Sequence, residues 1–347
     1  MTINVGIVGY GLSGSAFHAP IISVVDGLTL KAIVTSQADK VLMRYPHVTT
    51  YAAYDELLAD DTIDLVVVTT PTFTHYNYVK EAILHKKHVI VEKPFTVTAA
   101  EADDLITLAE QYQVLLSVYQ NRRYDNDFLT VKDILHSHIL GNLALFESHM
   151  DRYRHHVQNR WKEQDKPGSG SLYDIGSHLI DQAIELFGTP QTVYADLASQ
   201  RPAAMTNDYF HLILSYGSLR VILQSGSLVR QPGPRFTLHG ENGSFTKFGL
   251  DPQENALRQG DVPYTSHYGL EDDNLYGKLQ TTIDNLTITG KVTTLKGCYE
   301  KYYEGIVQAI LGTSRVPVTA MEARKVIRTI ELAIESHKQQ RVVLWSE

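Results

Sequence analysis

Hydrophobic residues in the first third of the chain form short, nearly continuous runs. Helical patterns separate these runs, for example at residues 15–25 and 74–84. Valine- and isoleucine-rich runs at this rhythm predict a parallel sheet that crossover helices cover on both faces. The runs are INVGIVG (3–9), LTLKAIVTS (28–36), DLVVVTT (64–70), HVIVEKP (88–94) and VLLSVYQN (114–121).

Beyond residue 121 hydrophobic and polar positions alternate more regularly. Alternation predicts strands with one buried face, and ENGS at 241–244 predicts a hairpin turn. Residues 251–295 give weak signals and are expected to be rich in loops. The alternating segments are ALFESHMDRY (144–153), TVYADLAS (192–199), YFHLILSY (209–216), RVILQSGSLV (220–229) and RFTLHG (235–240).

The chain closes with an amphipathic helical pattern, TAMEARKVIRTIELAIESHKQQ. Its apolar positions are Ala323, Val326, Ile327, Ile330, Leu332 and Ile334. The fold class predicted from the whole pattern is α/β. It has an N-terminal Rossmann domain with a doubly wound parallel sheet at 1–121. A C-terminal α+β domain with a large, mostly antiparallel open sheet follows at 122–347, and its last helix can pack back on the first domain.

Composition narrows the class of partners. The 347 residues fit about two domains, and a hydrophobic content of 43% supplies a large core. The net charge of −8 argues against nucleic acid and anionic membrane surfaces, which need clustered positive charge. Cys298 is the only cysteine, so no intrachain disulfide can form. Together with the lack of a signal-type N-terminus or a membrane-spanning run, this predicts a cytoplasmic protein.

The sequence GYGLSG follows the first predicted strand and opens a helix. In this context the pattern G-x-G-x-x-G predicts a dinucleotide-binding loop. Its first glycine allows a tight turn, its second lets backbone N–H groups approach a pyrophosphate, and its third lets helix and strand pack closely. The alternative is a plain strand-to-helix turn. The predicted cofactor-binding residues here are Gly9, Tyr10, Gly11, Leu12, Ser13 and Gly14.

The end of the second strand indicates which dinucleotide binds. NAD sites usually carry an acidic residue there for the ribose 2′-hydroxyl. This chain has Ser36 and Gln37 instead, with Lys40 close behind. These groups donate hydrogen bonds and do not repel a 2′-phosphate, so NADP is favoured. If they are ordinary loop residues, NAD is accepted as well.

Two further strand ends carry candidate residues at the edge where open α/β sheets bind ligands. Glu92 and Lys93 follow a buried run, where a lysine is costly unless it serves a ligand or pairs with an acid. The alternative is a solvated strand end. The preceding strand brings Thr70 and Pro71 to the same edge, and His75 lies on the helix that follows.

The segment SLYDIGSHLID at 171–181 combines Asp174, His178 and Asp181 at helical offsets. In a regular helix the three side chains share one face, and the first two lie one turn apart. An aspartate could then orient an imidazole for proton transfer. Ser171 and Asp174 also suit a helix capping box, which is the structural alternative. Asp181 is expected to make a helix or domain contact.

These motifs together resemble the Gfo/Idh/MocA oxidoreductase family over nearly the whole chain. GYGLSGSAFHAP, TTPTFTH, EKPFTVTAAEA and YDIGSHLID occur in the family's order and spacing. SVYQNRRYDNDFLT and PVTAMEARKVIRTIE resemble more narrowly the NADP-dependent scyllo-inositol 2-dehydrogenase subgroup. That subgroup has arginine where this chain has Gln37.

The resemblance implies a role for each matching position. Lys93 matches the lysine that bridges cofactor and substrate hydroxyl, and Asp174 and His178 match the catalytic pair, with His178 as proton acceptor. The implied reaction moves a hydride between a secondary alcohol of a cyclic polyol or sugar and NADP, with NAD possible. A homodimer or homotetramer is implied through the open sheet. The candidate substrate-binding residues, whose alternative role is interdomain or cofactor contact, are Arg123, Tyr153, Arg160, Trp161 and Tyr173.

Three other functions are alternatives to this reaction. The same residues could reduce a dicarbonyl or anhydrosugar or oxidise a hexose, because ring stereochemistry is read by loops. A dinucleotide-sensing regulator without catalysis would be expected to lack the lysine or the histidine, and both are present. A metal enzyme is disfavoured, since His155 and His156 are adjacent and no HExxH motif or cysteine pair occurs.

Overall fold

The computed structural model describes residues 2–346, which form two compact units. The first unit comprises Met1–Tyr124, Pro252–Gly269 and Cys298–Arg324. The second comprises Asp125–Asp251, Leu270–Gly297 and Lys325–Glu347. Each unit has its own sheet.

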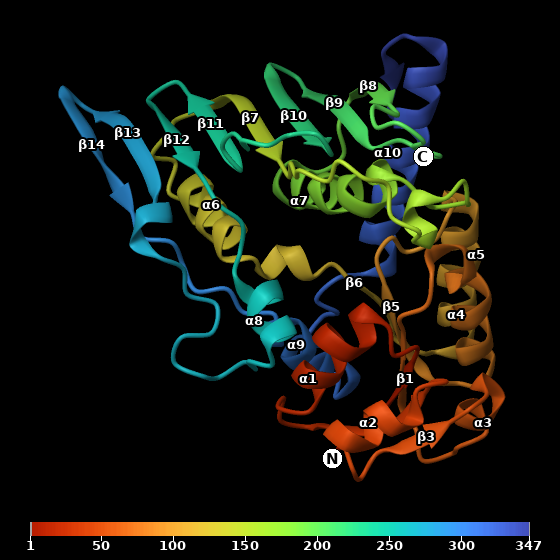
Figure 1. Ribbon diagram of the computed structural model, residues 1–347. Coiled ribbons are helices and arrows are strands. Elements are labelled where there is room, and N and C mark those ends of the chain that lie inside the picture. The colour runs from red at the N-terminus through yellow and green to blue at the C-terminus, as the bar shows by residue number, and fades with distance from the viewer. Residues whose placement is uncertain (1, 347) are drawn as a thin grey trace. The chain divides into compact units, whose positions relative to one another are not determined.

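A six-stranded parallel sheet forms the centre of the first unit (Figure 1). Its order, β3-β2-β1-β4-β5-β6, is that of a dinucleotide-binding Rossmann fold. The valine-rich strand β4 is fully buried, as expected for a parallel strand covered on both faces. The strands are β1 (Ile3–Val8), β2 (Leu28–Val34), β3 (Thr49–Tyr51), β4 (Leu65–Val68), β5 (His88–Glu92) and β6 (Leu116–Tyr119).

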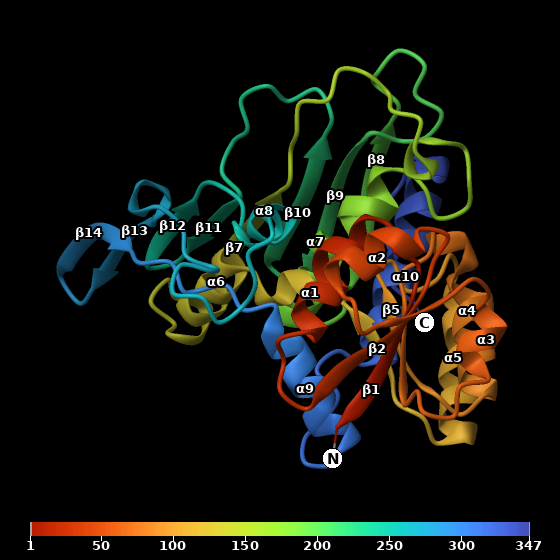
Figure 2. The ribbon, with the colours of Figure 1, turned by 60° about the horizontal axis from the view of Figure 1, so that its bottom comes forward.

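Helices pack on both faces of this sheet. In Figures 1 and 2, α4 and α5 lie side by side on one face, while α1 and α9 lie on the other. Thr98 begins α5 with a capping box, since its hydroxyl accepts from the Glu101 N–H. The helices are α1 (Ala19–Ile22), α2 (Ala38–Arg44), α3 (Tyr54–Leu58), α4 (His75–Leu84), α5 (Ala99–Tyr112), α8 (Gln253–Gln259) and α9 (Glu300–Ile310).

The first unit is discontinuous in sequence, a feature that the expected division at residue 121 does not include. The physical reason is a buried aromatic cluster. Tyr299, Tyr302 and Tyr303, at the start of α9, are all fully buried. The rings of Tyr302 and Tyr303 lie 4.9 and 5.8 Å from that of Tyr119 on β6. Late residues of the chain therefore complete the core beside the parallel sheet.

The second unit contains a nine-stranded sheet in the order β14-β13-β12-β11-β7-β10-β9-β8-β15. Its pairs are antiparallel except for β7 with β10. The predicted fold class, a parallel Rossmann sheet plus a mostly antiparallel sheet, is confirmed. The strands are β7 (Leu143–His149), β8 (Thr192–Ala198), β9 (Tyr209–Tyr216), β10 (Leu219–Gly226), β11 (Phe236–Gly240), β12 (Gly243–Lys247), β13 (Gly277–Ile283), β14 (Leu286–Val292) and β15 (Val343–Leu344).

Helices α6 (Asn126–His136) and α7 (Ser177–Phe187) lie on one face of this sheet (Figure 1). Burial alternates along β9, so its other face is half-exposed. The predicted turn at 241–244 is confirmed, because β11 and β12 are joined there in a hairpin with His239 opposite Ser244. The predicted C-terminal helix is α10 (Ala320–Gln339), and the division between the units falls within it, after Arg324.

The expectation that residues 251–295 are rich in loops is confirmed only in part, since loops separate regular elements in this stretch. This stretch contains α8 and the hairpin of β13 with β14. Every residue of β14 is exposed or half-exposed, so the alternation of apolar and polar residues in LTITGKV does not correspond to a buried face. Backbone pairing, not burial, defines this hairpin.

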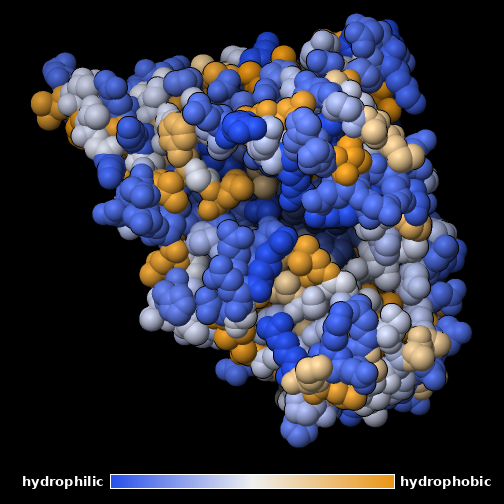
Figure 3. Space-filling view, viewed as in Figure 1, coloured by the Kyte–Doolittle hydropathy of each residue, from blue (hydrophilic) through white to orange (hydrophobic). Residues whose placement is uncertain are grey.

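One face of the molecule shows how hydrophobic side chains are distributed on it. Figure 3 shows mostly hydrophilic side chains on the face in view, with hydrophobic ones in small separate patches. Among residues 2–346, no helix combines the length and hydrophobicity needed to cross a bilayer.

Candidate active site

The glycine loop of the first unit has the geometry that its motif requires. Gly9 has φ of +98°, which favours glycine, and a Cβ at Gly14 would lie 2.3 Å from the Gly9 carbonyl oxygen. A Cβ at Gly11 would meet nothing within 4 Å. The loop thus combines a tight turn, a close helix–strand contact and open space at its middle glycine. These features fit a dinucleotide pyrophosphate.

Both helices that carry candidate residues begin with a π-helical turn. In the first unit it covers Gly14–His18, directly after the loop, and in the second it covers Leu172–Gly176 around Asp174. Such turns are rare and occur frequently at functional sites. The second one also corrects the expectation of a regular helix from Asp174 to Asp181, because only His178 and Asp181 lie in the α-helical part.

The strand end of β5 is not solvated, which removes the structural alternative for Glu92. Glu92 is buried, and its side chain accepts hydrogen bonds from the Ser13 hydroxyl and, at 3.0 Å, from the Lys93 N–H. His18 Nε2 lies 2.9 Å from the same carboxylate. The backbone of Lys93 is therefore joined through Glu92 to the glycine loop.

Electrostatics keep Glu92 ionised. Burial raises its pKa, but the hydrogen bond and charge of His18, the nearby Lys93 and the Ser13 hydroxyl outweigh burial and lower the pKa to about 2. His18 is itself fully buried, and its Nδ1 lies 2.5 Å from the Tyr303 hydroxyl. Sequence reasoning missed His18 and Tyr303. The only signal was a histidine on the buried side of the first helix.

Lys93 lies among acidic groups of the first unit. Its positive charge lowers the pKa of Glu92 and contributes to the lowered pKa of Glu254 on α8. Burial raises the pKa of Glu254, but Arg122, Arg258 and Lys93 together outweigh it. Arg122 lies 2.9 Å from the Glu254 carboxylate. Sequence reasoning missed Glu254, which lies more than 150 residues along the chain from Lys93.

His75 has a supporting position in the structure. Its ring is buried, with Nδ1 2.9 Å from the Pro94 carbonyl oxygen and Nε2 2.8 Å from that of Thr70. Burial lowers the pKa of this imidazole. The ring thus joins the ends of β4 and β5 through their backbones and holds the loop around Thr70 and Pro71. The neighbouring Thr69, which sequence reasoning missed, donates to the Val8 and Gly9 carbonyls, both at 2.9 Å.

The polar residues predicted to select the dinucleotide lie after β2. Ser36, Gln37 and Lys40 are all exposed, and the Lys40 ammonium donates to the Gln37 side-chain oxygen at 2.6 Å. The Gln37 N–H donates to the Thr35 hydroxyl at 2.9 Å. Arg44, at the end of α2, donates to the Ser15 carbonyl at 3.2 Å. This strand end therefore presents donors and basic groups.

In the second unit the helix that carries His178 is capped from outside. Ser171 makes no side-chain cap hydrogen bond, and the Asn207 side chain accepts from the Leu172 N–H at 2.8 Å. The proposed capping box of Ser171 and Asp174 is therefore wrong. The Asp174 carboxylate instead lies 2.6 Å from the Lys162 ammonium and 3.6 Å from the Arg152 guanidinium. His178 and Asp181 are 5% and 2% exposed.

The predicted substrate residues have different surroundings. Arg160 and Asp174 line one cavity of the second unit. Tyr153 lies on the surface, where its hydroxyl accepts from Arg230 at 2.6 Å. Tyr173 is buried, and the Trp161 ring lies 5.7 Å from the Lys162 ammonium. Arg123 belongs to the first unit and lies 3.3 Å from Glu322.

Comparisons with known proteins agree with this arrangement. Residues 3–120 match the model of an oxidoreductase family with an NAD-binding Rossmann fold, and residues 132–344 match its C-terminal alpha/beta domain. The scyllo-inositol 2-dehydrogenase (NADP(+)) of Bacillus subtilis (strain 168) is 44% identical over 99% of this chain and 96% of its own. An uncharacterized oxidoreductase of Escherichia coli (strain K12), YdgJ, is also 44% identical, over 97% of each chain.

Solved structures give the same result. The Bacillus subtilis protein yvaA has a TM-score of 0.96 and 43% identity, covering 100% of this chain and 99% of its own. An oxidoreductase from Bacillus cereus has a TM-score of 0.93 and 32% identity, covering 100% and 99%. The parallel sheet with its glycine loop, the mixed second sheet and these full-length matches show that the chain belongs to the Gfo/Idh/MocA family of oxidoreductases.

Proposed function

We propose that this protein is an NADP-dependent dehydrogenase that interconverts a secondary alcohol of a cyclic polyol or sugar and the corresponding ketone. The observation that carries the proposal is the link from the glycine loop to Lys93. Ser13 binds the Glu92 carboxylate, and this carboxylate binds the Lys93 N–H. The lysine is thus fixed beside the loop that fits the dinucleotide.

Each side chain has a defined part in the reaction. The nicotinamide cofactor supplies the acceptor for the hydride that leaves the alcohol carbon. Lys93 donates to the alcohol oxygen and stabilises negative charge that develops there. His178 accepts the hydroxyl proton and passes it to solvent, so the alcohol loses one hydride and one proton and becomes a ketone. Asp174 stabilises the imidazolium that His178 becomes.

The preference for NADP rests on the end of β2. Ser36, Gln37 and Lys40 offer donors, and no acid stands at positions 35–37 to repel a 2′-phosphate. The similarity to an NADP-dependent relative supports the same choice. Because Gln37 replaces the arginine of the subgroup, activity with NAD is expected at a lower level.

The decisive experiment is a screen of both cofactors against scyllo-inositol, other inositols, aldoses and 1,2-dicarbonyls. We expect NADP-linked oxidation of a polyol, with scyllo-inositol as the first substrate to try. Absence of cofactor turnover across the panel, with tight cofactor binding retained, would instead indicate a dinucleotide-sensing regulator.

Variants test the assigned roles. Lys93→Ala and His178→Ala are each expected to lower kcat by roughly 10²- to 10⁴-fold, because each removes a group that acts on the alcohol oxygen or its proton. NADPH affinity, measured by fluorescence titration, should change little. Lys80→Ala and His136→Ala, at a half-exposed and an exposed helix position, are the matched controls. Wild-type turnover in either active-site variant would contradict the mechanism.

A homo-oligomer remains a prediction. The half-exposed face of the nine-stranded sheet is the surface on which a second copy is expected to pack. Size-exclusion chromatography with light scattering measures the assembly directly.

A further inference from the structure

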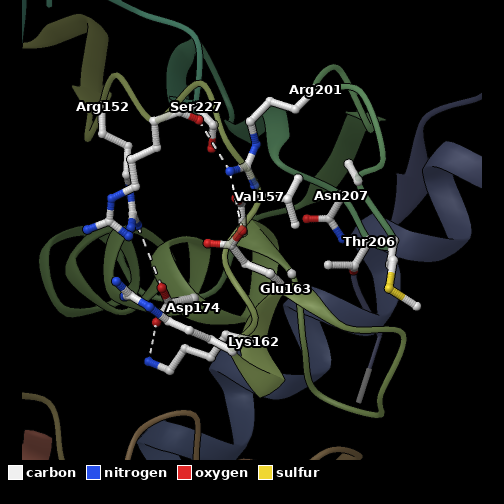
Figure 4. Close-up of a pocket in the computed structure, with 15 residues that line it drawn as sticks. Arg152, Val157, Lys162, Glu163, Asp174, Arg201, Thr206, Asn207 and Ser227 are labelled. Carbon is white, nitrogen blue, oxygen red and sulfur yellow. Dashed lines mark hydrogen bonds and ion pairs between the residues drawn. The ribbon is translucent and has the colours of Figure 1, made fainter.

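The second unit contains a cavity of unusual charge, which we name the cationic cavity (Figure 4). Asp174 and Glu163 are its acidic residues. Figure 4 shows Lys162 and Arg152 directed toward Asp174, and Arg201 directed toward Glu163. Its five basic residues are Arg152, Arg154, Arg160, Lys162 and Arg201.

Neighbouring acids neutralise only part of this charge. Arg201 lies 2.8 Å from Asp208 and 3.3 Å from Glu163, and Lys162 lies 2.6 Å from Asp174. Within residues 2–346, neither Arg154 nor Arg160 has an ion-pair partner within 4.0 Å. Five basic and three acidic groups leave an excess of about two positive charges.

The excess charge acts on the arginines themselves. Burial lowers the pKa of Arg154, and the positive charges of Arg152 and Arg160 lower it further. Asp174 and Glu163 act in the opposite direction but do not compensate. Like charges gathered in one place destabilise one another, and a bound anion would relieve this repulsion.

The cavity is built on a fixed frame. The Arg154 N–H donates to the Ser227 carbonyl at 2.8 Å, and Arg201 donates to the carbonyls of Arg154 and His156 at 3.3 and 3.2 Å. Asn207, on the loop that follows Arg201, caps the helix that carries Asp174. The loops that carry Arg154 and Arg201 are therefore held together by hydrogen bonds, and Asn207 joins the second of these loops to the helix that carries the proposed catalytic pair.

The size of the cavity limits what can enter it. Its volume is about 40 Å³. At roughly 10–15 Å³ for each water, it holds about three waters. This enclosed space suits a compact polar group such as a single phosphate or carboxylate. Guanidinium groups bind both anions through paired hydrogen bonds.

We propose that the alcohol substrate carries a compact anionic substituent, a phosphate ester or a carboxylate, which binds Arg154 and Arg160 in the cationic cavity. This inference rests on the proposed dehydrogenase function and narrows its substrate class. A phosphate monoester carries a charge of about −1.5 to −2 at pH 7, which matches the excess of positive charge better than a carboxylate does. Because Asp174 also lines the cavity, an anion bound to these arginines lies near the proposed catalytic pair.

The test compares matched substrates at constant ionic strength with NADP. Each neutral polyol or sugar is measured beside its phosphate monoester and its carboxylate, for example inositol with inositol 1-phosphate, and glucose with glucose 6-phosphate and glucuronate. We expect kcat/KM to be at least about 10-fold higher for one anionic member, because charge-assisted hydrogen bonds to arginine are worth about this factor or more. The better anion identifies the substituent.

Variants locate the effect. In Arg154→Gln and Arg160→Gln, the ratio of kcat/KM for the anionic member to that for the neutral member should fall by about 10- to 100-fold. Arg220→Gln, at an exposed position on β10, is the matched control and should leave the ratio unchanged. Inorganic phosphate should raise the thermal unfolding temperature of the wild type, and this rise should be lost in Arg154→Gln.

Two outcomes separate this inference from the proposed function. Efficient oxidation of neutral polyols, with no gain for anionic ones and no change of ratio in the variants, overturns the inference and leaves the dehydrogenase intact. Failure to oxidise any alcohol with either cofactor overturns the proposed function. In that case the binding of inorganic phosphate tests the cationic cavity by itself. Phosphate binding that does not depend on Arg154 and Arg160 also overturns the inference.

Discussion

Two regions of this protein are suited to bind negatively charged groups. One uses backbone groups, and the other uses charged side chains. The loop from Gly9 to Gly14 contains no charged side chain, and it combines backbone N–H groups with open space at Gly11. The cationic cavity of the second unit is bounded by five basic side chains. Ligand binding by backbone groups depends on the shape of the loop. Ligand binding by charged side chains depends on their exposure to solvent and on the salt concentration.

The difference has a functional reading. All dinucleotide cofactors share the same pyrophosphate, so a rigid, uncharged loop serves the first unit. Substrates vary among relatives of one fold, and side chains on loops can change without rebuilding the sheet. The comparison therefore predicts that the two regions respond differently to added volume, lost support and salt.

Added volume should give the largest effect, and it should break the first region only. In Gly14→Ala the new methyl group would lie 2.3 Å from the Gly9 carbonyl oxygen, so the loop must move. We expect a stability loss of about 1–3 kcal/mol in urea unfolding and a loss of NADPH affinity of roughly 100-fold or more.

Gly11→Ala is the matched control for that variant. Its methyl group meets no protein atom within 4 Å, so stability should change by less than about 0.5 kcal/mol. It should still weaken NADPH binding by roughly 10-fold, since it fills the space that a pyrophosphate needs. Unchanged binding in Gly11→Ala would show that the cofactor does not use this loop.

Lost support should have the next largest effect. Glu92→Gln removes the negative charge that binds His18 and the hydroxyl of Ser13, which is part of the glycine loop. A pKa lowered from 4.5 to about 2 corresponds to roughly 3 kcal/mol of stability. We expect Glu92→Gln to lose about this amount at pH 7, and the exposed Glu110→Gln to lose little.

The same prediction has a pH dependence of fixed sign. Because the pKa of Glu92 is lower in the folded state, its contribution is complete above about pH 4.5 and is lost as the pH falls toward 2. The gap between wild type and Glu92→Gln, measured by denaturant unfolding, should therefore close across this range. A gap that stays constant from pH 7 to pH 2 would contradict the ion pair.

A change of salt concentration should give the smallest effect, and it should distinguish the cationic cavity from the glycine loop. Raising ionic strength from 0.05 to 0.5 M is expected to raise KM for an anionic substrate by roughly threefold, since exposed charges are screened over a few ångströms. The affinity for NADH, which lacks a 2′-phosphate, should change less. Equal salt dependence for both would remove the distinction between the two regions.

Sequence reasoning reached the parts of the site that local chemistry dictates. A turn with φ of +98° at Gly9 and a carbonyl pressed against Gly14 restrict those positions to glycine, so the motif is visible in one chain. The lysine after β5 can also be recognised in one sequence, because a charged residue directly after four buried residues is costly unless it serves a ligand or pairs with an acid. The sheets followed from runs and alternation.

The remaining parts depend on contacts between residues distant in sequence. His18 and Tyr303, which support Glu92, are 285 positions apart. The sequence around one of them does not indicate its contact with the other. The cationic cavity collects residues from the connection between β7 and Leu172, around 154 and 162, and from the loop between β8 and β9, around 201. The π turn at Asp174 was also invisible, since the residue spacing there matches an ordinary helix.

The split construction of the first unit bears on how the protein is made. A ribosome releases Tyr119 long before it reaches Tyr299, Tyr302 and Tyr303, which complete the same aromatic cluster. At about 5–20 residues per second, synthesis from Tyr119 to Tyr299 takes roughly 10–35 seconds. During this time the nascent first unit lacks the tyrosines that cover this part of its core. A fragment ending near residue 124 should therefore aggregate or recruit chaperones, and residues 298–324, supplied in trans as a peptide, should rescue its solubility.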